Sequence, residues 1–176
     1  METRGNVQEL DRRFLSRTIE LAKSAFSKGY SPVGCVIVDR ENNILYEAES
    51  RRLIGTISHA EMFALLELQR DNIPDWGMGL TMYCTLEPCL MCMGMSLIAR
   101  ISRIVWAIND FWGGASRIYK FDHPYLVSRK TEFVSAPFLD LERIAQEMWM
   151  KYLESTGHAH MTLAVLGIEG VECVSS

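Results

Sequence analysis

The sequence lacks the long apolar run and the charge excess that mark several large classes of protein. No stretch of the 176 residues approaches the roughly 20 consecutive apolar residues that a membrane-spanning helix needs. The first residues, METRGNVQELDRR, also lack the apolar core of a secretory signal. The formal net charge is −4, so the chain as a whole is not drawn to nucleic acid or anionic membranes. We therefore expect a cytoplasmic protein that does not contact a membrane.

The cysteines argue against a disulfide framework. There are five of them, an odd number, and thiols stay reduced in the cytoplasm. Cys35 and Cys84 fall in apolar segments and are expected to be small core residues. Cys89 and Cys92 are separated by two residues, and this spacing needs a chemical explanation.

The composition and the apolar pattern predict one folded domain, residues 1–176, in which the role of the tail 156–176 is left open. Apolar residues make up 48% of the chain and charged residues 23%, as in ordinary globular proteins. The spacing of apolar residues predicts helices over 10–28, 59–70, 88–99 and 139–155. Alternating or continuous apolar runs predict a hairpin over 33–49 and strands over 80–85, 103–108 and 131–136. The segment 109–130 is interpreted as a loop with some helix, and the segment 161–174 as a further strand. Alternating strands and helices predict a layered α/β fold with a partly parallel sheet.

Three side chains near two predicted helix starts form a set that suits zinc. His59 begins one helix, and Cys89 and Cys92 lie one turn apart on the same face of another. Two thiolates and one imidazole are ligands that zinc prefers, and three protein ligands leave a fourth position open, as in catalytic sites. A redox pair is the alternative interpretation of the two cysteines, but it would not account for the nearby histidine and glutamate.

Glu61 lies two residues after His59 and has two possible roles. With Ser58 it has the spacing of a capping box, which predicts a helix cap. Beside a zinc site it could instead move protons, because zinc lowers the pKa of water to near neutrality. The two roles are compatible. The pattern H-x-E followed by P-C-x-x-C is the known signature of zinc-dependent nucleobase deaminases, in which the glutamate is the general acid and base.

The chain resembles the cytidine deaminase-like superfamily, and is most similar to the branch of tRNA adenosine deaminases and guanine or nucleoside deaminases. Four segments carry the resemblance: LAKSAFSKGYSPVGCVIVD, HAEMFAL, LTMYCTLEPCLMCMGMSLIARISRIVW and AIND. The resemblance implies a three-layer α/β/α sandwich around a five-stranded mixed sheet, and a homodimer. It also implies that His59, Cys89 and Cys92 bind zinc, that Glu61 shuttles protons, and that the backbone N–H of Ala60 helps to hold the substrate.

The segment before H-A-E departs from that branch, which has an asparagine there followed by Asp-Pro-Thr-Ala. This chain has ESRRLIGTIS, so Ser50 or Glu49 falls near the place of the asparagine that contacts the base. After the strand 103–108, Asp110 is a candidate to contact the substrate. Trp112 could stack on a base or pack in the protein.

Three features favour a small-molecule substrate: the net negative charge of the chain, the departure from the branch in the segment before H-A-E, and the mixed charge of the helix over 139–155. We therefore predict a zinc-dependent enzyme that hydrolyses the C–N bond of a cyclic amidine, releasing ammonia from a free nucleobase or nucleoside, with purines favoured. Editing of adenosine to inosine in tRNA is the alternative. A catalytically silent, zinc-stabilised binding scaffold is the third possibility, and the presence of Glu61 argues against it.

Overall fold

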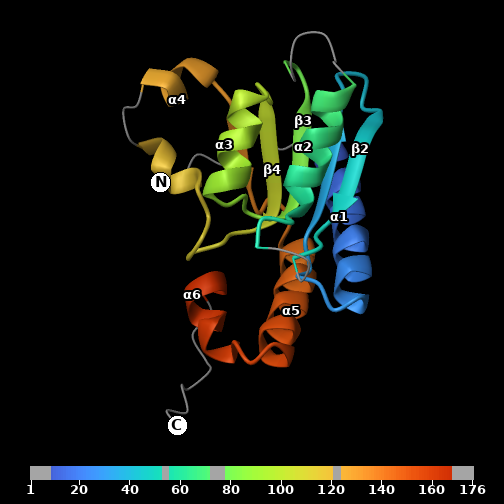
Figure 1. Ribbon diagram of the computed structural model, residues 1–176, viewed down its shortest axis with the longest axis vertical. Coiled ribbons are helices and arrows are strands. Elements are labelled where there is room, and N and C mark those ends of the chain that lie inside the picture. Colours follow the sequence, from blue (N-terminus) through green and yellow to red (C-terminus); the bar gives the residue numbers. More distant parts are fainter. Residues whose placement is uncertain (1–8, 53–55, 72–77, 121–123, 168–176) are drawn as a thin grey trace.

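The computed structural model describes residues 9–52, 56–71, 78–120 and 124–167, and its centre is a mixed five-stranded sheet (Figure 1). The strand order is β2-β1-β3-β4-β5. β1 pairs antiparallel with both β2 and β3, whereas β4 runs parallel to β3 and to β5. The strands span Gly34–Val38 (β1), Ile44–Glu49 (β2), Thr81–Leu86 (β3), Arg103–Ile108 (β4) and Glu132–Ser135 (β5). The predicted hairpin and the three predicted later strands are thereby confirmed.

Helices cover both faces of this sheet. α1 (Glu9–Ser27) and α5 (Leu139–Ser155) pack on one face, and α2 (Ala60–Arg70) and α3 (Leu90–Ile98) on the other (Figure 1). β1 and β4 are buried along their whole length, as expected for strands that are covered on both sides. The three-layer α/β/α arrangement that the resemblance implied is therefore confirmed.

Close packing of α1 on the sheet depends on a glycine and on an aromatic pair. A Cβ atom at Gly34 would lie 2.3 Å from the backbone oxygen of Thr18, so only glycine lets β1 approach the helix this closely. The rings of Phe14 and Tyr83 lie 5.0 Å apart between α1 and β3, and both side chains are buried. This contact forms part of the apolar core between the first helix and the sheet.

The C-terminal part of the chain corrects one prediction. After α5 the chain forms the short 3-10 helix η2 (Ala159–Met161) and then α6 (Thr162–Leu166), where a strand was expected. The sequence TLAVL is an apolar run too short for its periodicity to distinguish helix from strand. Residues 168–174 of that prediction lie outside the described residues.

The segment between β4 and β5 contains η1 (Ser116–Lys120) and α4 (Pro124–Arg129), in agreement with a loop containing some helix. α5 projects beyond the edge of the sheet, and α6 lies beside its end (Figure 1). α2 and α3 begin at this same edge. Among the described helices, none combines the length and apolar character needed to cross a membrane.

Candidate metal centre and active site

The ends of β2 and β3 bring the starts of α2 and α3 together at one edge of the sheet. His59 is the N-cap residue of α2, and Cys89 is the N-cap residue of α3, three residues after β3 ends. Pro88, at which the predicted helix over 88–99 begins, lies just before that N-cap. Ligand sites in layered α/β proteins form at such edges, where strands lead into helix starts.

The spacing of the three predicted ligand atoms fits zinc. Nδ1 of His59 lies 3.6 Å from Sγ of Cys89 and 3.6 Å from Sγ of Cys92, and all three atoms lie within 4.8 Å of one another. Zinc bonds of about 2.3 Å to sulfur and 2.0 Å to nitrogen place neighbouring tetrahedral ligand atoms about 3.5 Å apart. The side chains could therefore hold the ion with little movement.

The surroundings of the two thiols also favour the negative charge that binds a cation. A hydrogen bond with Cys92, and then one with His59, lowers the pKa of the Cys89 thiol to about 3. The thiolate is the form of cysteine that binds metal. The pKa of Cys92 is raised because its thiol hydrogen bonds to Cys89. A negative charge thus resides on this pair.

Glu61 projects from the first turn of α2 into the same site. The residue is only 3% exposed, and its Oε2 atom has no hydrogen-bond partner among the described residues. Burial is the main cause that raises the pKa of its carboxyl to about 7. A buried carboxylate oxygen without a partner is costly in a folded chain. The arrangement is accounted for if the partner is a bound water, substrate or ion.

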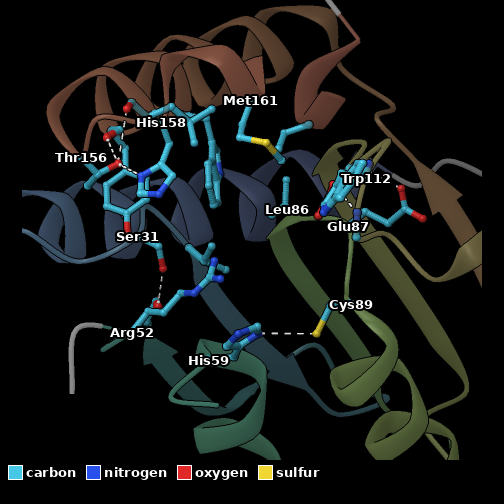
Figure 2. Close-up of a pocket in the computed structure, with 18 of the residues that line it drawn as sticks. Ser31, Arg52, His59, Leu86, Glu87, Cys89, Trp112, Thr156, His158 and Met161 are labelled. Atoms are coloured by element: carbon cyan, nitrogen blue, oxygen red, sulfur yellow. Dashed lines mark hydrogen bonds between the residues drawn. The ribbon is translucent and has the colours of Figure 1, made fainter. Parts of the chain in front are cut away.

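The predicted capping box is wrong. The N-cap residue of α2 is His59 rather than Ser58, and no side chain caps the helix. Ser58 lies outside the helix. The imidazole at the N-cap is directed to the thiol of Cys89, as Figure 2 shows, and also lies 3.6 Å from that of Cys92.

A pocket with a volume of about 530 Å³ opens beside the three candidate ligands (Figure 2). Its wall comes from several parts of the chain: the segment before β1, the segment after β2, the end of β3, the starts of α2 and α3, the loop after β4, and the C-terminal helices. The lining includes His59, Glu61 and Cys89; Ser50 and Arg52; Asp110, Trp112 and Gly113; and Trp149, Tyr152, Leu153, Thr156, His158, Met161 and Val165. The volume is in the range of sites that enclose small ligands.

The segment around the expected asparagine position contributes only one of its two candidates to the pocket. Ser50 lines the wall, where its hydroxyl shares a hydrogen bond of 2.6 Å with that of Ser31. Glu49 does not line the wall, and its carboxylate is ion-paired with Lys28. Ala60 is fully buried and is likewise absent from the lining.

The loop after β4 places Asp110 and Trp112 in the wall. Oδ1 of Asp110 accepts hydrogen bonds from the backbone N–H groups of Trp112, at 3.0 Å, and Gly113, at 2.8 Å. Burial raises the pKa of this carboxyl. Trp112 is 73% exposed, so it is not a core residue and its ring is accessible to a ligand.

Glu87 is a structural part of the site that was not predicted from the sequence. It is 4% exposed, and its two carboxylate oxygens accept hydrogen bonds from the backbone N–H groups of Asp110, at 3.1 Å, and Ser116, at 3.0 Å. Glu87 therefore ties the loop after β4 to the segment that carries Cys89. The only signal in the sequence was its position directly before Pro88 and Cys89. A single acidic residue at such a position is usually exposed to solvent, so the sequence did not predict its burial.

The site has the parts of a zinc-dependent hydrolytic deaminase, and a family comparison agrees. The model of the cytidine and deoxycytidylate deaminase zinc-binding region matches residues 8–108. That is more than half of the chain, so the chain belongs to this family. Its cofactor is zinc, and its reaction is the hydrolysis of a C–N bond of a nucleobase or nucleoside.

Similar proteins include tRNA-specific adenosine deaminases. The one from Haemophilus influenzae is 38% identical over 119 residues, covering 65% of this chain and 68% of that protein. The one from Aquifex aeolicus is 31% identical over 142 residues, covering 78% of this chain and 93% of that protein.

Solved structures of deaminases have the same fold. A structure from a study of tRNA:A34 deaminases superposes with a TM-score of 0.66 at 25% identity, over 78% of this chain and 99% of that chain. A guanine deaminase from Nitrosomonas europaea has a TM-score of 0.64 at 17% identity, over 85% and 88% of the two chains. The second likeness establishes the fold alone.

Proposed function

We propose that this protein deaminates adenosine to inosine in tRNA. The structural observation that carries the deaminase chemistry is the unpartnered, buried oxygen of Glu61 beside the triad of His59, Cys89 and Cys92. The support for tRNA as the substrate is the two relatives described as tRNA-specific adenosine deaminases. They favour tRNA over the free purine that the charge balance suggested.

The residues of the site divide the chemistry among them. His59, Cys89 and Cys92 would hold the zinc ion, which when bound supplies hydroxide from water near neutral pH. Glu61 takes a proton from the attacking water and delivers it to the exocyclic amino group, which leaves as ammonia. Trp112 offers an exposed aromatic surface on which a base can stack.

The test is deamination of a tRNA transcript with adenosine at the wobble position. Zinc-loaded protein is expected to convert that adenosine to inosine, and the Glu61→Ala variant is expected to do so at a greatly reduced rate. Sequencing of the reverse-transcribed product detects inosine as guanosine. Binding should weaken as salt is raised, because phosphate contacts release counterions. Absence of inosine together with undetectable tRNA binding at low salt would rule out this substrate.

A free purine base or nucleoside is the second candidate, and the C-terminal wall favours it. Seven lining residues come from the segment 149–165, and the apolar ones among them include Trp149, Leu153 and Val165. Apolar walls of this kind are typical of sites that enclose small molecules. A panel of guanine, adenine, cytosine and their nucleosides, scored for ammonia release, tests this candidate. Bound zinc with no turnover of any substrate would instead favour a silent binding scaffold.

We also propose that the protein is a homodimer, as the resemblance implies. The outer surface of α3 supports this proposal, because Leu90 and Ile98 are 64% and 67% exposed there. Leu66 on the neighbouring α2 is also exposed. Light scattering after size-exclusion chromatography should give twice the mass of the 20.1 kDa chain, and a monomeric mass at micromolar concentration would contradict the proposal.

A further inference from the structure

The pocket extends beyond the zinc ligands, and the end opposite them is polar. Figure 2 shows Ser31, Thr156 and His158 on the side of the pocket across from His59 and Cys89. The guanidinium of Arg52 projects into the space between these two sides. A base held beside Glu61 would therefore leave the far part of the pocket for whatever is attached to that base.

Arg52 is a cation without a partner among the described residues. No described residue forms a hydrogen bond or an ion pair with it, although it lines a pocket that also contains acidic groups. The acidic groups of the loop region are otherwise engaged: Glu87 and Asp110 accept hydrogen bonds from backbone N–H groups. The five N–H donors of Arg52 are thus available to a ligand.

The neighbouring polar groups suit a sugar. The hydroxyl of Thr156 donates to the backbone oxygen of Tyr152 at 2.9 Å, so it can accept the N–H of Nδ1 of His158, 3.2 Å away. Nε2 of His158 is then left to accept a hydrogen bond from a ligand hydroxyl. The hydroxyl of Ser31 lies on the same side of the pocket.

We propose that Arg52 binds the phosphate carried by the ribose of the substrate, so that the enzyme recognises a nucleotide rather than a base or nucleoside. The inference rests on the proposed function, which places the base at the zinc end of the pocket. A planar guanidinium is the side chain best suited to phosphate, because it can donate two parallel hydrogen bonds. The phosphate belongs either to a free mononucleotide or to an RNA chain, and these share the same chemistry.

Binding of reaction products tests the proposal without any need for turnover. Calorimetry would compare inosine with inosine 5′-monophosphate on the zinc-loaded wild-type protein and on Arg52→Gln. The wild-type protein is expected to bind the nucleotide about tenfold more tightly than the nucleoside, as one charge-assisted contact can provide. Arg52→Gln is expected to bind the two equally, with unchanged affinity for inosine.

Arg51 provides the matched control. It is the adjacent residue and is also exposed, but its guanidinium lies over the ring of Phe63, 5.1 Å from the centroid, and it does not line the pocket. Arg51→Gln should therefore keep the full preference for the nucleotide. A loss of preference in both variants would show a general charge effect and would overturn the assignment to Arg52.

A second ligand identifies the source of the phosphate. An anticodon stem-loop with inosine at the wobble position should bind more weakly to Arg52→Gln than to Arg51→Gln if the phosphate belongs to RNA. A preference confined to the mononucleotide would identify a free nucleotide instead, and either result supports the proposal. Equal affinities of the wild-type protein and Arg52→Gln for both phosphate-bearing ligands would overturn it. Phosphate recognition without ammonia release would refute the proposed function and leave the proposed phosphate contact intact.

Discussion

At the scale of single residues, the strongest prediction concerns the carboxyl of Glu61. Glu61→Gln keeps the shape of the side chain but removes its ability to take up and release a proton. We expect kcat to fall by about 10³-fold, within the range that general acid–base catalysis supplies. The melting temperature and the zinc content should not fall, because the residue is not one of the three ligands. Ammonia release and zinc stoichiometry on the same preparation measure both effects.

Glu67 is the control for this change. It lies on the same helix, but its carboxylate is exposed and forms an ion pair with Arg70 at 2.8 Å. Glu67→Gln should therefore leave turnover close to that of the wild-type protein. Full activity in Glu61→Gln would contradict the assignment of proton transfer to that carboxyl.

The cysteines allow a second comparison at this scale. Cys92 and Cys84 are both fully buried, yet only Cys92 lies in the metal-binding group, while Cys84 pairs in register with Cys35 across β1 and β3. Cys92→Ala should lose zinc and activity together, because two ligands hold the ion poorly. Cys84→Ala should keep one zinc ion per chain and lose only about 1 kcal/mol of stability, since one buried sulfur is removed. Zinc retained in Cys92→Ala would argue against its role as a ligand.

At the scale of elements, sequence patterns predicted spacing better than side-chain direction. The placement of Cys89 and Cys92 one helical turn apart, and the start of α2 within one residue of His59, followed from local rules of helical geometry. The capping-box prediction was wrong because the N-cap residue is His59, whose side chain is directed toward Cys89 and Cys92 at the start of α3. Glu49 ends β2 near the expected place, yet its carboxylate pairs with Lys28. Which side chain enters a pocket depends on packing between elements that no single segment encodes.

The loop after β4 is the element whose position should matter most for substrate binding. A Cβ atom at Gly114 would lie 2.3 Å from Cδ of Glu87 and 2.4 Å from the backbone oxygen of Asp110. Gly114→Ala must therefore displace the loop or the carboxylate that holds it. We expect KM to rise several-fold, because the displaced loop includes Trp112. Zinc content is measured on the same preparation, because Gly114 forms a β-bridge with Cys89. Steady-state kinetics with the substrate identified by the assays above provides the measurement.

Gly94 provides the matched substitution in α3. A Cβ atom there would meet nothing within 4 Å, and alanine is favoured over glycine inside a helix by roughly 0.5–1 kcal/mol. Gly94→Ala should therefore leave KM unchanged. An unchanged KM in Gly114→Ala would show that the tie between the loop and Glu87 is not needed for binding.

At the scale of the whole molecule, one buried ion pair joins the first helix to the sheet that supports the site. Asp11 of α1 is fully buried and accepts hydrogen bonds from Arg103 of β4 at 2.6 and 2.8 Å and from the hydroxyl of Tyr83 of β3 at 2.9 Å. Arg103 also forms an ion pair with Glu132 of β5 at 3.2 Å. These contacts tie one helix layer to three adjacent strands.

Loss of this ion pair should destabilise the fold without changing the chemistry. Asp11→Asn leaves the buried charge of Arg103 without its main partner, and we expect the free energy of unfolding to fall by about 3 kcal/mol. The adjacent Arg12→Gln removes an exposed ion pair with Asp140 and a contact with the ring of Phe138, so its effect should be smaller. Urea unfolding measures both changes. At temperatures where Asp11→Asn remains folded, its kcat should equal that of the wild-type protein, because the pair does not line the pocket. A loss of stability no larger than that of Arg12→Gln would show that the interior tolerates the loss of this charged partner.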